Sequence, residues 1–148
     1  MASRKHFIPN GFTLIEILLV SALSTAIAAS GIVYGLDTYR GYLFRTERDT
    51  LVHVLGKARS RALSNMYQTV HGVHIEGAAY VLFRGGTYHA GDPSNEQIPK
   101  STLITITTPG DITFDQLSGD ANTAGNIVLH DGIRSAIISI NHEGLINW

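Results

Sequence analysis

The feature that most constrains how this chain can fold is a long apolar run near its N-terminus. Residues 17–36 are twenty consecutive residues without a charged side chain. A helix of that length rises about 30 Å, which is the thickness of the hydrocarbon core of a bilayer. Arg4 and Lys5 precede the run, and residues 1–11 contain no acid. We therefore expect this end to stay cytoplasmic and the chain from Asp37 onward to be exported.

Glu16 is the ionisable residue at the start of this segment. A carboxylate at membrane depth is costly unless it is paired, which makes Glu16 a candidate functional residue. The alternative is a solvated carboxylate at the membrane interface. A secretory signal is a competing interpretation of the run, with residues 26–30 as a weak small-residue cleavage site. The run is longer than the apolar region of such a signal.

The residues around Glu16 form a specific motif. The segment GFTLIE, residues 11–16, follows a short basic leader and precedes the apolar run. In this arrangement it resembles the class III signal of type IV pilins and pseudopilins. The resemblance implies that a prepilin peptidase cuts between Gly11 and Phe12 and methylates the new amine of Phe12. It also implies that Glu16 acts in assembly, where it could pair with the amine of a neighbouring subunit as a desolvated but matched pair.

A less specific resemblance covers the rest of the chain. The stretch ARSRA, residues 58–62, resembles the end of the long helix in the GspH/FimT group of minor pseudopilins and minor pilins. Residues 112–114, 117–120, 126–129 and 141–144 are similar to the C-terminal half of that group. This resemblance implies a structural subunit at a filament tip that helps to start assembly of a type IV pilus or a type II secretion pseudopilus. Its implied partners are a prepilin peptidase, other pilins or pseudopilins, an inner-membrane assembly platform and the lipid bilayer.

The same resemblance implies a location. The subunit would cross the cytoplasmic (inner) membrane once, with its head outside the cytoplasm, and would then join a periplasmic or extracellular filament. The alternative function is a tip adhesin or a DNA-uptake receptor on the same scaffold, with residues 85–100 as the ligand-binding loop.

Helical periodicity continues beyond the membrane run. No proline interrupts residues 12–65, and apolar residues recur every three or four positions. We expect a leader at 1–11, a transmembrane or filament-core helix at 12–36 and a soluble half of the same helix at 37–65. The soluble half would bury its apolar stripe, which comprises Leu36, Tyr39, Leu43, Leu51, Val54, Leu55, Ala58 and Ala62.

Residues 66–148 favour β-structure. Alternating and β-branched segments predict strands at 69–76, 79–84, 103–107, 112–114, 127–130, 134–140 and 145–148. The first two flank Gly77 as in a hairpin, and Asp131-Gly132 indicates a tight turn. Residues 85–100 and 119–125 are expected to be surface loops. The predicted fold class is α+β, a type IV pilin-like fold in which one long N-terminal helix packs on a small antiparallel β-rich head.

Charge is unevenly distributed, although the formal net charge is only −1. Residues 37–61 carry six cations and three acids, which gives +3, and residues 62–148 carry three cations and eight acids, which gives −5. Either these charges are ordinary solvated surface, or the acidic head meets a basic neighbour in a filament tip. The absence of cysteine excludes a disulfide framework, a thiolate metal site and a cysteine nucleophile.

Metal sites are weakly indicated. His71 and His74 are three residues apart, which places them on opposite faces of a strand, and neither has an evident carboxylate partner by spacing. Four acids and one amide in the second half of the chain could supply oxygen ligands to calcium: Asp111, Asp115, Asp120, Asn122 and Asp131. Their spacing fits no defined calcium-binding loop. We expect no metal and no cofactor.

Catalysis and direct DNA capture are not favoured. The sequence has no Gly-x-Ser-x-Gly, His-Glu-x-x-His or phosphate-loop motif, so we expect a substrate of an enzyme rather than an enzyme. DNA-linked minor pilins use basic residues near the C-terminus, but no Lys or Arg follows Arg134. An acidic head opposes phosphate binding. Trp148 could stack on a base, although packing on its own domain is the more ordinary role.

Overall fold

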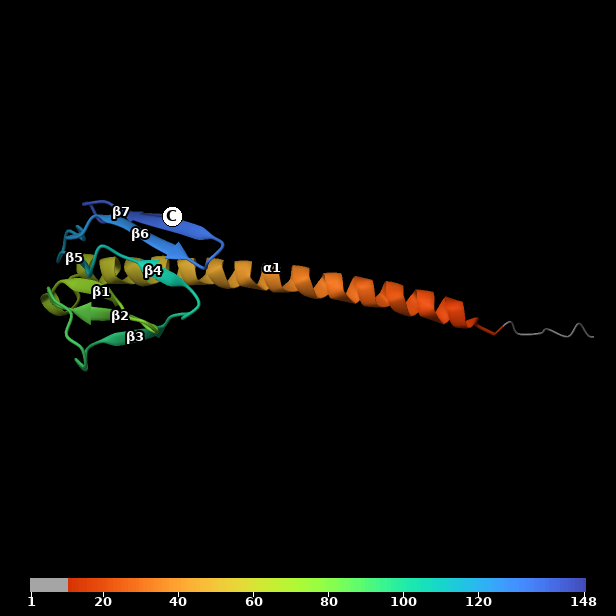
Figure 1. The fold of residues 1–148 in the computed structure, drawn as a ribbon. Coiled ribbons are helices and arrows are strands. Elements are labelled where there is room, and N and C mark those ends of the chain that lie inside the picture. The colour runs from red at the N-terminus through yellow and green to blue at the C-terminus, as the bar shows by residue number, and fades with distance from the viewer. Residues whose placement is uncertain (1–10) are drawn as a thin grey trace, which may run out of the picture. The chain divides into compact units, whose positions relative to one another are not determined.

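A computed structural model describes residues 11–148, and its elements are labelled in Figure 1. The chain divides into two compact units at the junction between Gly41 and Tyr42. Helix α1 (Leu14–Leu63) is 50 residues long and belongs to both units. The sequence predicted this helix to within two residues at each end.

The described part of the first unit is the first half of α1 and the three residues before it. Every side chain described between residues 11 and 40 is exposed. Leu36 and Tyr39 were expected on the buried stripe, but they are 56% and 60% exposed, so that prediction was wrong. The apolar character of this segment therefore has no partner among residues 11–148.

The second unit contains two antiparallel sheets. The first has the strand order β3-β2-β1-β5, and the second has the order β4-β6-β7-β8. The strands of the first sheet are β1 (His71–Ile75), β2 (Ala79–Arg84), β3 (Glu96–Pro99) and β5 (Ile112–Phe114). Those of the second are β4 (Thr105–Thr107), β6 (Gly125–His130), β7 (Ser135–Ile140) and β8 (Ile146–Asn147). The α+β fold class is confirmed.

The core lies where both sheets meet the second half of α1, and Figure 1 shows the sheets flanking it. The helix contributes side chains three or four residues apart, as helical periodicity requires. These are Phe44, Leu51, Val54, Leu55, Ala58 and Ala62. Alternate residues of the strands face them, among them Val73, Tyr80, Leu82, Ile112, Phe114, Ile127, Leu129, Ile138 and Ile140. The stripe predicted for residues 51–62 is thus buried.

The outer face of the first sheet is covered by the chain between β2 and β3. The ring of Phe83 lies on Gly72 of β1, where a Cβ atom would come within 2.4 Å of that ring. Tyr88 packs in turn on Phe83, with ring centroids 5.8 Å apart. Phe83 is therefore 1% exposed although it points away from the helix side of the sheet.

Most predicted strands are present with shifted ends, and β2 and β5 have the predicted bounds. The expectation of a loop throughout residues 85–100 was wrong at its end. Residues 96–99 form β3, which pairs with β2 from Ala79↔Pro99 to Leu82↔Glu96. Pro99 is tolerated because β3 is an edge strand and ends there.

Candidate functional site

The predicted processing site lies just before α1. Gly11, Phe12 and Thr13 have no helical structure and are exposed, and the helix begins at Leu14. The Gly11–Phe12 peptide bond is therefore outside the helical hydrogen-bond ladder. The predicted leader up to residue 10 lies outside the described residues.

Glu16 sits in the first turn of α1 and forms part of the helix cap. Its backbone N–H donates to the side-chain oxygen of Thr13 at 3.3 Å, and the N–H of Ile17 donates to the carbonyl of Thr13 at 3.2 Å. Thr-x-x-Glu is the sequence pattern of a capping box, in which Thr and Glu serve free amides at a helix start. The Thr13 half of this pattern is formed, and sequence reasoning missed it although the spacing of Thr13 and Glu16 could have indicated it.

The electrostatic setting of Glu16 is simple. Its side chain is exposed, and no cation lies within ion-pair distance of it among residues 11–148. The positive end of the helix dipole favours a carboxylate in the first turn. The described part of the chain thus leaves the charge of Glu16 available to a partner.

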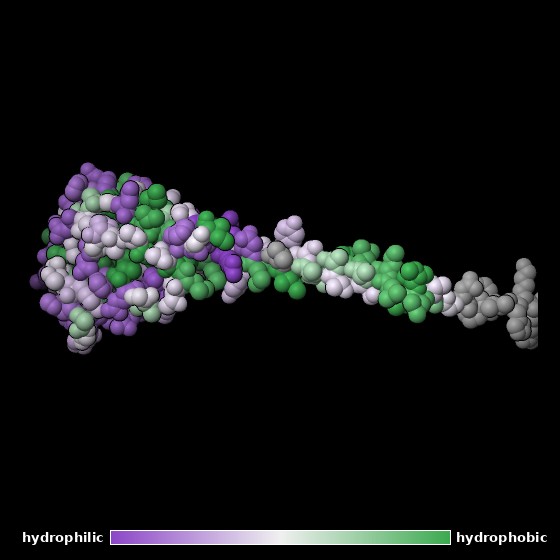
Figure 2. Space-filling view, in the orientation of Figure 1, coloured by the Kyte–Doolittle hydropathy of each residue, from purple (hydrophilic) through white to green (hydrophobic). Residues whose placement is uncertain are grey.

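The segment after Glu16 is chemically suited to lipid. Figure 2 shows that apolar surface predominates along this part of α1. The side-chain hydroxyls of Thr25 and Ser30 donate to the carbonyls of Ser21 and Ala26 at 2.8 and 2.9 Å, so they need no water. By length and composition α1 could cross a membrane.

His71 and His74 lie on different sides of β1. His71 is fully buried, and its Nε2 atom lies 2.8 Å from the carbonyl oxygen of Met66. The Nδ1 atom of His74 lies 2.6 Å from a carboxylate oxygen of Asp111. Spacing along the chain indicated no carboxylate partner for either histidine, but the fold supplies one for His74, because the pairing of β1 with β5 brings Asp111 beside β1.

A small polar cluster surrounds His74. The ring of Tyr88 stacks on it with centroids 4.0 Å apart, and the Tyr88 hydroxyl donates to Glu76. That hydrogen bond raises the pKa of Tyr88. Together these contacts fasten the chain between β2 and β3 to β1, so the start of the expected ligand loop is anchored by its own side chains.

The acids considered for calcium do not converge. Asp131 accepts hydrogen bonds from the N–H groups of Ile133 and Arg134, which lower its pKa and close the predicted turn. Asp111 bonds to His74. Residues 11–148 contain no group of three or more His, Asp or Glu side chains placed to hold a metal ion.

Comparison with known proteins adds no relative. The chain matches no protein-family model, no curated protein and no solved structure. Its structure is compatible with a pilin-like layout, in which a long apolar N-terminal helix packs on a small antiparallel head.

Proposed function

We propose that the chain is a structural subunit of a type IV pilus or of a type II secretion pseudopilus, in the class of minor pilins and minor pseudopilins. It is made as a precursor in the cytoplasmic membrane, cut after Gly11 and methylated on Phe12. An assembly platform then moves it into a filament with other subunits, where it sits at the tip and helps to start assembly. In this role it is not an enzyme.

One observation carries the proposal. An exposed, non-helical Gly11–Phe12 bond lies three residues before a helix whose first turn holds one acid, Glu16. Twenty uncharged residues follow that acid, and all of their described side chains are exposed. In lipid an unpaired carboxylate at this position is costly, whereas a subunit that moves from lipid to a protein filament can pair it with a neighbour.

The test is the intact mass of the membrane-extracted chain, expressed with and without a prepilin peptidase. We expect loss of residues 1–11 and gain of one methyl group only when the peptidase is present. A matched control is Gly11→Leu, which fills the small-residue position before the cut and should stay unprocessed. An inserted but uncut native chain in both strains would overturn the proposal.

A further inference from the structure

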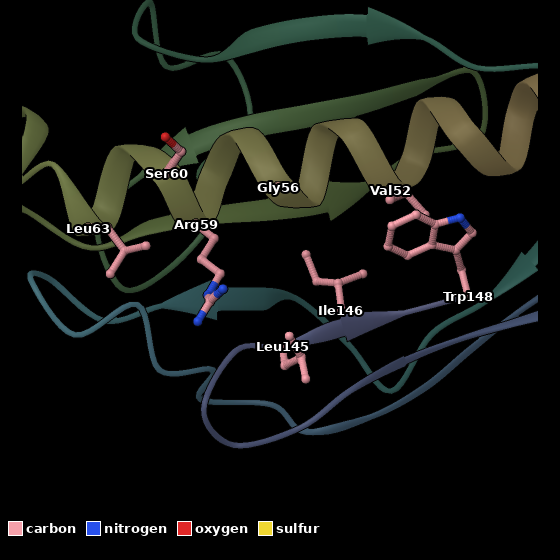
Figure 3. Close-up of a pocket in the computed structure, with 8 residues that line it drawn as sticks. All are labelled: Val52, Gly56, Arg59, Ser60, Leu63, Leu145, Ile146 and Trp148. Atoms are coloured by element: carbon pink, nitrogen blue, oxygen red, sulfur yellow. The ribbon is translucent and has the colours of Figure 1, made fainter.

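The second unit carries an apolar groove that the chain itself does not fill. It lies between the second half of α1 and β8 and has a volume of about 380 Å³ (Figure 3). Gly56 and Ser60 form part of its helix side, and Leu63, Leu145, Ile146 and Trp148 line it further.

The large side chains of this groove are unusually open to solvent. Leu63 is 43% exposed, Leu145 is 50% exposed and Trp148 is 64% exposed. The role expected for Trp148, packing on its own domain, is therefore only partly met. Neighbouring exposed apolar side chains of this kind mark interaction sites more often than scattered single ones do.

At Gly56 no side chain covers the backbone of α1 on the helix side of the groove. A Cβ atom added there would meet no atom within 4 Å. Glycine inside a helix costs about 1 kcal/mol relative to alanine. Nothing packed within the described chain accounts for this cost, whereas a partner that approaches the helix closely would do so.

The groove selects an uncharged partner. Arg59 is its one charged lining residue. Its guanidinium already donates to the carbonyl oxygens of Gly119 and Glu143, at 3.3 and 2.8 Å. A charged partner side chain would have to be desolvated against Trp148 and Leu145, which is unfavourable.

The same chain presents a surface of matching chemistry. Leu19, Leu23 and Ile27 are four residues apart on α1, so they form one ridge, and they are 65%, 60% and 66% exposed. No charge interrupts residues 17–36. Once such a segment leaves lipid, only protein can cover it.

We propose that this groove receives the ridge of Leu19, Leu23 and Ile27 from a second copy of the chain. The inference rests on the proposed function, because filament assembly is the step that removes the apolar segment from the bilayer. This contact would add β8 and Trp148 to the interface between subunits. It would require at least two adjoining copies of the chain. A ridge of aliphatic side chains fits beside Gly56 as helix ridges fit into grooves.

Engineered disulfides test this contact cleanly, because the chain has no cysteine. Two differently tagged full-length copies are expressed together in the organism that encodes the chain, one with Ser60→Cys and one with Leu23→Cys. A disulfide needs Cα atoms about 4.4–6.8 Å apart, so we expect about tenfold more covalent heterodimer than from a control pair. The control combines Leu23→Cys with Thr105→Cys, which is on the exposed edge strand β4.

Substitution at Gly56 tests the groove without disturbing the fold. Gly56→Phe fills the open space and should abolish the Ser60–Leu23 cross-link, whereas Gly56→Ala should retain it. Gly56→Ala should unfold thermally at or above the temperature of the native chain, because its Cβ atom meets no neighbour within 4 Å. The thermal midpoint of Gly56→Phe is measured beside it, so that loss of the cross-link is read only from a folded chain.

The outcomes separate the two proposals. Processed subunits that enter filaments but give only control levels of dimer would overturn the groove contact and leave the proposed function standing. Disulfides from Ser60→Cys to another protein alone would likewise rule out a second copy as the occupant. A chain that is neither cut nor assembled would remove both proposals together.

Discussion

The hydroxyl of Tyr80 donates a 2.7 Å hydrogen bond to the carboxylate of Glu47 inside the core. Tyr80 is fully buried and Glu47 is 8% exposed. The N–H of Ser101 lies 3.2 Å from both oxygens of the same carboxylate. A buried acid on α1 is thus satisfied by β2 and by the connection between β3 and β4, and it ties three segments together.

Removing the hydroxyl should be costly. In Tyr80→Phe the carboxylate keeps its burial but loses a donor, which should lower the free energy of unfolding by about 2 kcal/mol. Urea unfolding of the full chain in detergent, followed by Trp148 fluorescence, measures the loss. The control is Tyr88→Phe, whose hydroxyl bonds to Glu76 at the surface and should matter much less. Equal effects of the two variants would contradict this role for Glu47.

The same pair predicts sensitivity to alkali. Burial, and then the hydrogen bond to Glu47, raise the pKa of Tyr80 well above its ordinary value of 10.0. The stabilisation linked to a raised pKa is fully present below the unfolded value and is lost as the pH rises above it. We therefore expect the urea midpoint of the native chain to fall above about pH 10, and to fall less steeply in Tyr80→Phe. Parallel pH curves for the two proteins would refute this assignment.

The ion pairs of Glu96 predict that the stability of the fold falls in acid rather than in alkali. Hydrogen bonds from Lys57 and Arg61 lower the pKa of Glu96 below its ordinary value of 4.5. The contribution is present above that value and is lost as the pH falls through the lowered pKa. Glu96→Gln should cost roughly 1 kcal/mol at neutral pH, because the groups are partly exposed, and nothing in strong acid. Asp49→Asn, which removes the surface pair with Arg48, is the control and should cost less.

Local patterns predicted the elements of this fold well. The proline-free periodic stretch indicated α1, and the apolar segments at 79–84 and 112–114 became β2 and β5 with their predicted bounds. The strand β3 was missed because its residues, Glu-Gln-Ile-Pro, favour no strand by themselves. It forms because β2 offers an unpaired edge.

The features of the candidate sites also divide into those that a local pattern predicts and those that depend on long-range contacts. The exposed bond before Leu14 and the position of Glu16 followed from a contiguous motif. The contacts His74–Asp111 and Glu47–Tyr80 join residues more than thirty positions apart. No spacing rule along the chain reports such pairs, because the pairing of strands and the packing of α1 create them.

Gly72 should be intolerant of any side chain. A Cβ atom there would lie 2.4 and 2.8 Å from ring atoms of Phe83 and 2.9 Å from the methyl group of Thr113. Overpacking of this kind costs about 1–3 kcal/mol, so Gly72→Ala should lower the thermal midpoint measurably. Gly77→Ala is the control, since its Cβ atom would meet nothing within 4 Å. Adding Phe83→Leu to Gly72→Ala should restore part of the loss, and failure to do so would mean that Phe83 is not the obstacle.

The charge of Glu16 and the helix cap made by Thr13 can be separated by substitution. Glu16→Ala and Glu16→Val remove the carboxylate, and we expect the chains to insert in the membrane but not to join a filament. Glu16→Gln keeps a side-chain acceptor at the helix start but removes the charge, so it should also fail if pairing with a neighbouring amine is what matters.

Thr13→Ala removes the cap bond at 3.3 Å and keeps the charge. It should cost only about 1 kcal/mol of local helix stability and still assemble. The measurement is the ratio of filament-borne to membrane-borne subunit for each variant. Normal assembly of Glu16→Gln together with failure of Thr13→Ala would mean that assembly needs the helix cap and not the charge of Glu16.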